Sequence, residues 1–175
     1  SIEIKPEYAE AYYNLGITLL NLDKLDESEK NLKKATTIQK SYIDQIFNSA
    51  EKLFNLKRLK QAEILFKITI EFQPNLSLAY GRLGIIYFEA GKLKEAEANY
   101  IKAIKLKPDY TEAHYGLGII YHEQKLYKNS AKHFLLAKDY ADSQNYILRY
   151  YFRTNQKDNF YTQLNKMVNQ GLNNA

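Results

Sequence analysis

The chain has 175 residues, of which 45% are hydrophobic and 14% aromatic, and its formal net charge is +5. This composition excludes a disordered chain, and the length suffices for one domain or one continuous array of repeats. The absence of cysteine excludes disulfides, a thiolate nucleophile and a Cys-ligated zinc site. No apolar run reaches the ~18 residues that a membrane-spanning helix needs, so we expect a soluble protein and favour the cytoplasm without fixing the compartment.

One sequence pattern recurs along the chain. The segment AYYNLGITLL at 11–20 returns as AYGRLGIIYF at 79–88 and as AHYGLGIIYH at 113–122. A fourth segment, QIFNSAEKLF at 45–54, keeps the pattern of large residues but differs at most positions in residue identity. The four copies begin at evenly spaced positions, and a fixed period of about 34 residues is typical of helical repeat proteins.

Each copy predicts two helices joined by a tight turn. In the third copy, Tyr80, Leu83 and Tyr87 share one helical face, a second apolar stripe covers 93–104, and Pro108 ends it. Because one short helix pair cannot bury its apolar surface, consecutive pairs must stack and share a core. In chain order the pattern predicts helices at 8–21, 25–38, 42–55, 59–72, 76–89, 93–106, 110–123 and 127–140, then a degenerate pair near 143–153 and 158–169.

The copies at 9–42, 43–76, 77–110 and 111–144 resemble the tetratricopeptide repeat family in their length and in their residue pattern. The family's Leu-Gly pair is present in three copies, and Ser49 and Ala50 replace it in the second. Other positions of the second helices match the family with small residues (Ser28, Ala62, Ala96, Ser130, Ala35, Thr69, Ala103, Ala137) and with large residues (Leu32, Phe66, Tyr100, Phe134). The family's closing proline is present as Pro74 and Pro108, and Lys40 and Asp142 replace it in the other two copies.

The resemblance implies an all-α fold, a right-handed α–α superhelical solenoid in which small residues let paired helices approach and a large residue fills the remaining space. We expect residues 1–8 to be the tail of a truncated upstream repeat. We expect 145–175 to form a degenerate capping helix pair, with a polar face made by Arg149, Arg153, Gln163, Asn165, Lys166 and Asn169.

The sequence offers no convincing catalytic or metal site. His122 and Glu123 begin a zinc-protease-like motif, but Leu126 stands where the second histidine is needed. The GLG at 116–118 lies inside a predicted helix rather than after a strand. There is also no Gly-x-Ser-x-Gly elbow and no phosphate-binding loop. We therefore predict a protein that is not an enzyme and needs no cofactor.

The first helix of each copy carries a second apolar face that needs a partner. The family resemblance implies that these helices line the concave side of the solenoid and hold a segment of another protein. Several of these residues have an alternative role, which is packing against the next repeat. The predicted partner-binding residues are Tyr13, Asn14, Ile17, Phe47, Asn48, Glu51, Phe54, Arg82, Ile85, Phe88, Tyr115, Ile119 and His122. Gly81 and Gly116 are expected either to open pockets there or to allow a tight helix contact.

Charge narrows the choice of partner. On this side of the solenoid there are several acidic residues and one cation, Arg82, whereas most lysines fall on turns and second helices. We therefore predict that the partner binds through an apolar or mildly basic peptide segment. A carboxylate-binding clamp is doubtful because Tyr13, Ile17 and Leu78 stand where the family's other clamp residues would be. Alternatives are a nucleic acid or membrane-surface binder that uses the lysine-rich convex face, and the interaction arm of a larger enzyme. End-to-end self-association through Ile2 and Ile4 is a further expectation.

Overall fold

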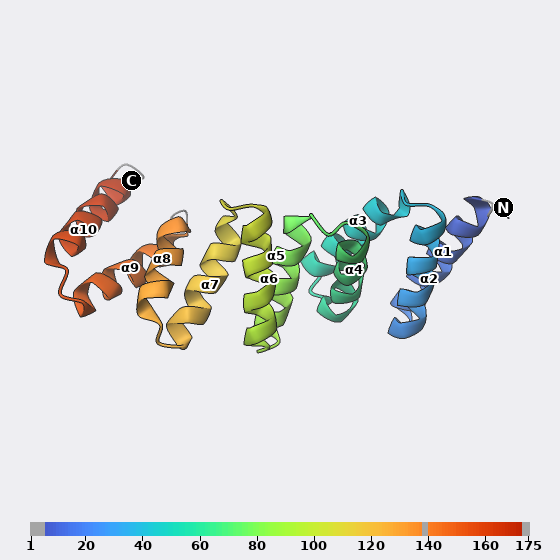
Figure 1. Ribbon diagram of the computed structural model, residues 1–175, viewed down its shortest axis with the longest axis horizontal. Helices are drawn as coiled ribbons and strands as arrows, with labels where there is room; N and C mark the ends of the chain where they lie inside the picture. The colour runs from blue at the N-terminus through green and yellow to red at the C-terminus, as the bar shows by residue number, and fades with distance from the viewer. Residues whose placement is uncertain (1–5, 138–139, 173–175) are drawn as a thin grey trace.

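The computed structural model describes residues 6–137 and 140–172, and the regular secondary structure of this part of the chain is entirely helical (Figure 1). The helix bounds follow the predicted ones closely. The main difference is α8, which ends at Leu136 rather than at residue 140. The elements are α1 (Pro6–Asn21), α2 (Leu25–Ile38), α3 (Tyr42–Asn55), α4 (Leu59–Phe72), α5 (Ser77–Glu89), α6 (Leu93–Leu106), α7 (Thr111–Glu123), α8 (Tyr127–Leu136), α9 (Ala141–Arg153) and α10 (Lys157–Leu172).

The turn inside each helix pair has the same backbone geometry. One residue per turn adopts a positive φ, and these residues are Asp23, Lys57, Gly91, Lys125 and Asn155. The residue that follows donates its N–H back to a carbonyl of the first helix, as Lys92 does to Tyr87 over 2.9 Å. This is a left-handed helix end, for which glycine is the least strained residue. The first four positions are evenly spaced along the chain, whereas Asn155 comes earlier than the same spacing requires because the last pair departs from the repeat.

The pairs stack in chain order into an elongated α-solenoid, with α1 and α2 at one end and α10 at the other (Figure 1). Within the array the second helix of a pair packs against the first helix of the next, as α4 does on α5 and α6 on α7. The first junction differs, because α2 packs more extensively against α4 than against α3.

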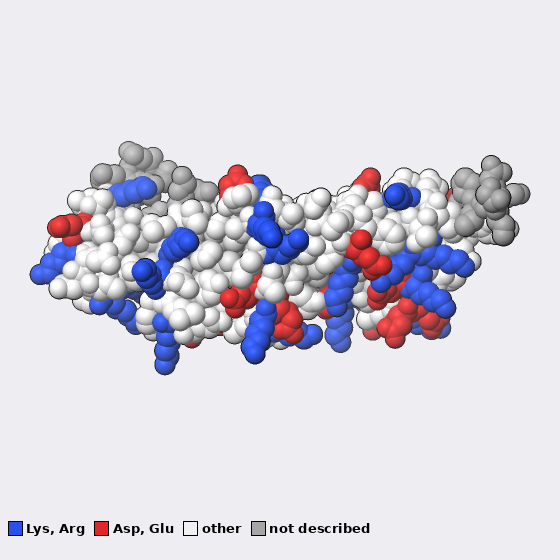
Figure 2. Space-filling view, viewed as in Figure 1, with Lys and Arg blue, Asp and Glu red and all other residues white. Residues whose placement is uncertain are grey.

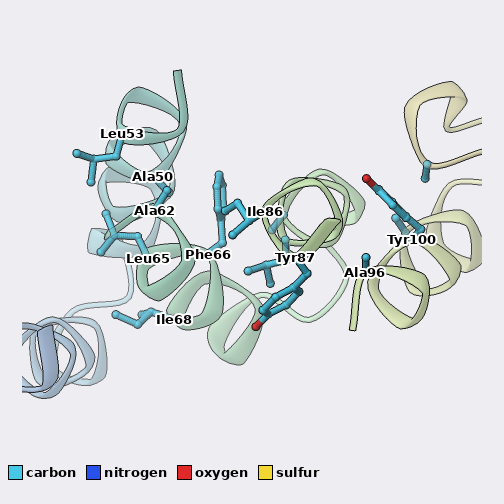
Figure 3. Packing of buried hydrophobic residues seen from close by; sticks show 14 of the residues in the cluster. Ala50, Leu53, Ala62, Leu65, Phe66, Ile68, Ile86, Tyr87, Ala96 and Tyr100 are labelled. Atoms are coloured by element: carbon cyan, nitrogen blue, oxygen red, sulfur yellow. The ribbon is translucent and has the colours of Figure 1, made fainter. Parts of the chain in front are cut away.

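The core is built from large side chains that lie against glycine. Tyr100 of α6 is almost completely buried, and its ring lies between Gly84 of α5 and Gly116 of α7. A Cβ atom at either glycine would come within 2.5 Å of the ring. Phe134 makes the equivalent contact with Gly118 in the next pair. The expected pairing of small and large residues is therefore confirmed, and Figure 3 shows Tyr100 beside Ala96, with Phe66 close to Ile86.

Glycine at the predicted binding side makes a tight helix contact and does not open a pocket. A Cβ at Gly81 would collide with the hydroxyl oxygen of Tyr110, and one at Gly116 would collide with the ring of Tyr100. The chain's own tyrosines fill both spaces. The pocket interpretation of Gly81 and Gly116 is therefore wrong.

The last pair leaves apolar side chains in solvent. Phe152 is 75% exposed, and Tyr161 and Leu164 are also exposed. Phe152 and Phe160 join the lining of a cleft of about 290 Å³ at the turn between α9 and α10. The cap interpretation of this pair stays a prediction. Residues 1–5, which include Ile2 and Ile4, lie outside the described residues, as does the side chain of Asn169.

Charged side chains form scattered clusters on the face shown in Figure 2, much of which is uncharged, and acids and bases are mixed most densely over α2. Several lysines of the second helices are held by acids. Lys33 contacts Glu29 and Glu71, and Lys67 contacts Glu63, all within 2.8 Å. In the part of the chain that the structure describes, no helix is long and apolar enough to cross a membrane.

Candidate functional site

The predicted partner-binding side chains lie on α1, α3, α5 and α7, and we call this surface the first-helix face. Its large side chains, namely Tyr13, Ile17, Phe47, Phe54, Ile85, Phe88, Tyr115 and Ile119, are all half-buried, whereas Asn14 and Asn48 are exposed. The apolar side chains of this row are thus neither fully exposed to solvent nor fully buried in the core. One side of each ring packs inward and the remainder contributes to the surface.

Aromatic contacts show what holds these rings in place. Phe47 and Phe54 both lie edge-on to the buried Phe66, with ring centroids 6.0 and 6.3 Å away. Tyr115 stacks on Tyr140, which precedes α9, at 4.4 Å. Such contacts fix the ring orientations and lower the entropy cost of binding a ligand on the outer side.

The structure brings Glu51, Phe54 and Arg82 together into one cluster between α3 and α5. The Arg82 guanidinium donates two hydrogen bonds to the Glu51 carboxylate, at 2.9 and 3.2 Å, and lies 5.0 Å from the centroid of the Phe54 ring. Burial alone would lower the pKa of Arg82, but the hydrogen bonds to Glu51 outweigh it and raise the pKa. Since Glu51 neutralises this cation, Arg82 is not available as one arm of a carboxylate clamp.

His122 lies at the other end of the first-helix face. Its ring contacts Tyr146 of α9 at 4.8 Å and Tyr127 of α8 at 5.5 Å. Burial and the nearby Arg153 and Arg149 side chains lower the pKa of His122 below its ordinary value, so the ring is neutral at pH 7. The predicted residues of α1, α3 and α5 are distant in the chain from this end.

The two other histidines, the buried His114 and the half-buried His133, form a pair that the sequence did not predict. The Nε2 atom of His114 donates to the Pro108 carbonyl at 2.9 Å, so its Nδ1 accepts from Nδ1–H of His133, also at 2.9 Å. Burial, His114 and Lys132 lower the pKa of His133 to about 4. Among residues 6–137 and 140–172, no third His, Cys, Asp or Glu joins them in a metal-binding group.

A cleft of about 300 Å³ lies between α1 and α3 and was also missed. Its apolar wall is formed by Ile17, Leu20, Leu53 and Leu56, and its polar residues are Asn21, Ser49, Lys52 and Arg58. Among these, only Ile17 was a predicted binding residue. The signal was present in the repeat alignment, because Ser49 occupies the position of Leu83 and Leu117.

The comparisons with known proteins agree with this architecture. A family model described as TPR repeat matches residues 84–125, and one described as tetratricopeptide repeat matches residues 1–30. Among curated proteins, none matches this sequence significantly. The fold and the repeat thus define an all-α helical-hairpin solenoid. The two family matches identify tetratricopeptide repeats within residues 1–30 and 84–125 of this solenoid.

Solved structures of the same fold extend over most of the chain. A crystal structure of MamA protein has a TM-score of 0.66 at 16% identity and covers 94% of this chain and 92% of that one. PilF of Pseudomonas aeruginosa has a TM-score of 0.63 at 16% identity, covering 93% and 76%. YrrB, described as a TPR protein with an unusual peptide-binding site, has a TM-score of 0.61 at 16% identity, covering 90% and 84%. At these identities the likeness concerns the fold.

Proposed function

We propose that this protein is a non-catalytic interaction scaffold whose first-helix face binds a peptide segment of a partner protein. The observation that carries the proposal is the row of half-buried aromatic side chains along α3, α5 and α7, from Phe47 and Phe54 through Phe88 to Tyr115. Rigid aromatic anchors of this kind supply much of the affinity in protein interfaces. The description of YrrB as a TPR protein with a peptide-binding site supports the same function on the same fold.

The electrostatics of the face favour an apolar or mildly basic segment. Arg82 is neutralised by Glu51, and Lys57 forms an ion pair with Glu89 at 3.0 Å. The other acids that the sequence places on this side, including Glu10 and Glu112, leave it with a negative excess. A strongly acidic segment along the whole face would meet like charge, which opposes association.

The test starts from displayed random peptides of about twelve residues that are selected for binding to the wild type. The affinity of these peptides is then measured for the double variant Phe54→Ala with Phe88→Ala. We expect the selected binders to lose at least tenfold in affinity, because two anchors are removed from one surface. The matched control replaces two exposed apolar residues of second helices, Ile101→Ala with Leu135→Ala, and should leave binding intact. Circular dichroism must show both variants to be folded. Equal peptide affinity for the wild type and the Phe54/Phe88 variant would contradict a binding role of the face.

Binding of nucleic acid or an anionic membrane through the lysine-rich helices is the less favoured alternative. It needs cations free to neutralise phosphates, yet Lys33 and Lys67 are engaged by acids on the same surface. Its diagnostic is a steep fall of affinity with salt concentration. Peptide binding anchored by apolar contacts predicts a weak salt dependence.

End-to-end self-association is also proposed, and one observation favours it. Tyr8 and Leu15 of α1 and Leu22 just after it follow one another at heptad spacing, and all three are exposed. Leu15 is 48% exposed, whereas Leu83, which occupies the same position of α5, is 1% exposed. Light scattering should show an average mass that rises with concentration and falls when Leu15 is replaced by Lys.

A further inference from the structure

Two positions are buried in α5 and α7, the first helices of the third and fourth repeats. The equivalent positions of α3, in the second repeat, hold residues of a different kind. Leu83 and Leu117 are each 1% exposed, and Ser49 occupies the same position in the second repeat. Ile86 and Ile120 are also buried, and Lys52 stands at their position with its side chain exposed. Both positions face the preceding helix pair, since Ser49 and Lys52 line the cleft against α1.

The two replacements explain why the cleft exists. The serine side chain is smaller than that of leucine, so it leaves unfilled the space that Leu83 and Leu117 fill at later junctions. Lysine keeps its charge in water and cannot be packed there without a partner. The cleft is consequently lined by the half-buried Ile17 and by the buried Leu20 and Leu53 at its base, and Leu56 at its edge is 60% exposed.

The two charged side chains that line this cleft, Lys52 and Arg58, are both basic. In the described ranges 6–137 and 140–172 neither Lys52 nor Arg58 forms an ion pair, in contrast to Lys33, Lys57 and Lys67. Glu51, the chain neighbour of Lys52, forms its ion pair with Arg82 instead.

We propose that the cleft between α1 and α3 is an anchor site for a partner segment that carries a large apolar side chain next to a carboxylate. The apolar side chain enters between Ile17, Leu20 and Leu53, and the carboxylate meets Lys52 and Arg58. A volume of about 300 Å³ is at the small end of ligand sites, which suits one or two side chains rather than a folded domain. The inference rests on the proposed peptide-binding function and names the chemistry of one end of the bound segment.

The experiment uses the whole chain and a displayed library of random peptides of about twelve residues, selected on the wild type and tested in parallel on its variants. Ser49→Leu fills the cleft, and Ile101→Ala with Leu135→Ala, at exposed apolar residues away from the cleft, serves as its control. Lys52→Gln with Arg58→Gln removes the charge, and Lys60→Gln, an exposed lysine of α4, is the matched charge control. Thermal unfolding followed by circular dichroism checks that each variant is folded.

We expect the wild type to enrich peptides with a leucine-like or aromatic residue beside Asp, Glu or a free C-terminal carboxylate. Affinity for these peptides should fall at least tenfold in Ser49→Leu and in the Lys52/Arg58 variant, and stay within twofold in the Ile101/Leu135 variant and in Lys60→Gln. If Ser49→Leu does not fold, the charge variant alone decides, because it leaves the cleft volume almost unchanged.

Three results would overturn the inference. In the first, Ser49→Leu raises stability without changing peptide affinity, which makes the cleft a packing defect only. In the second, the selected peptides are basic or uncharged and lose affinity only in the Phe54/Phe88 variant, which removes the cleft site and leaves the proposed function standing. In the third, the wild type enriches no peptide at all, which removes both.

Discussion

The junction between the first two helix pairs and the junction between the third and fourth use the same helix positions with different side chains. At the later junction Leu117 and Ile120 are buried, and Tyr100 lies between Gly84 and Gly116. At the first junction Ser49 and Lys52 leave a cleft, and α2 packs on α4 instead. An unchanged repeat period therefore does not ensure equal coupling, because two side chains decide how tightly neighbouring repeats associate.

The strongest way to break the tight junction is Tyr100→Ala. The ring bridges three helices, so its removal leaves a large cavity, and we expect a loss of ~3–5 kcal/mol in the free energy of unfolding. Since repeats are stabilised by their neighbours, the urea transition should also become broader as the two halves uncouple. Urea denaturation followed by circular dichroism measures both effects. Tyr161→Ala, at an exposed tyrosine, should change stability by less than ~0.5 kcal/mol.

Converting the first junction to the later type tests whether these two side chains weaken it. Ser49→Leu combined with Lys52→Ile should fill the cleft and raise the free energy of unfolding by about 2 kcal/mol, since burying one leucine is worth ~1.5–3 kcal/mol. The same urea experiment measures it. A destabilised double variant would mean that the cleft cannot accept these side chains and that the junction differs for another reason.

The pair of His114 and His133 makes the fourth repeat pH-sensitive in a way that the others are not. The pKa of His133 is about 4 in the folded protein and near 6.5 when unfolded, so the unfolded chain binds the proton first. This contribution is complete above pH 6.5 and is lost as the pH falls towards 4. Because His133 is only half-buried, we expect the loss at pH 5 to be ~1 kcal/mol. His133→Gln should remove this part of the pH dependence, as seen in unfolding curves at pH 7 and 5.

The smallest expected effect concerns a turn. Lys125 has a φ of 61°, in the region where Gly91 serves the equivalent turn, so Lys125→Gly should relieve strain and stabilise by ~0.5–1 kcal/mol. Lys128→Gly, inside α8, should destabilise by ~1 kcal/mol because glycine is a poor helix former. Equal effects of the two substitutions on the melting temperature would exclude a special role for the turn conformation.

The helices could be predicted from the sequence because each depends on the local spacing of apolar residues and on the turn-forming residues that end it. Apart from α8, the observed helices begin and end close to the predicted bounds, and α6 ends just before Pro108 as expected. The early end of α8 at Leu136 was not apparent, because the apolar spacing continues beyond it.

The site was predicted only in part, because it depends on which side chains meet between helices. The half-buried row from Tyr13 to Ile119 follows from helix periodicity alone. The pairing of Glu51 with Arg82 and the filling of Gly81 by Tyr110 join residues that are far apart in the chain, and their geometry depends on rotamers that no pattern specifies. Ser49 was visible as a departure from the repeat, but the resulting cleft became evident only from the packing of α1 against α3.

Amide hydrogen exchange, compared helix by helix in the wild type and in Ser49→Leu with Lys52→Ile, tests most directly whether these two side chains open the first junction. We predict that α1, α2 and α3 exchange at least tenfold more slowly in the double variant, while α7 and α8 keep their rates. Unchanged exchange in α1 and α2, or equal slowing along the whole array, would contradict the account.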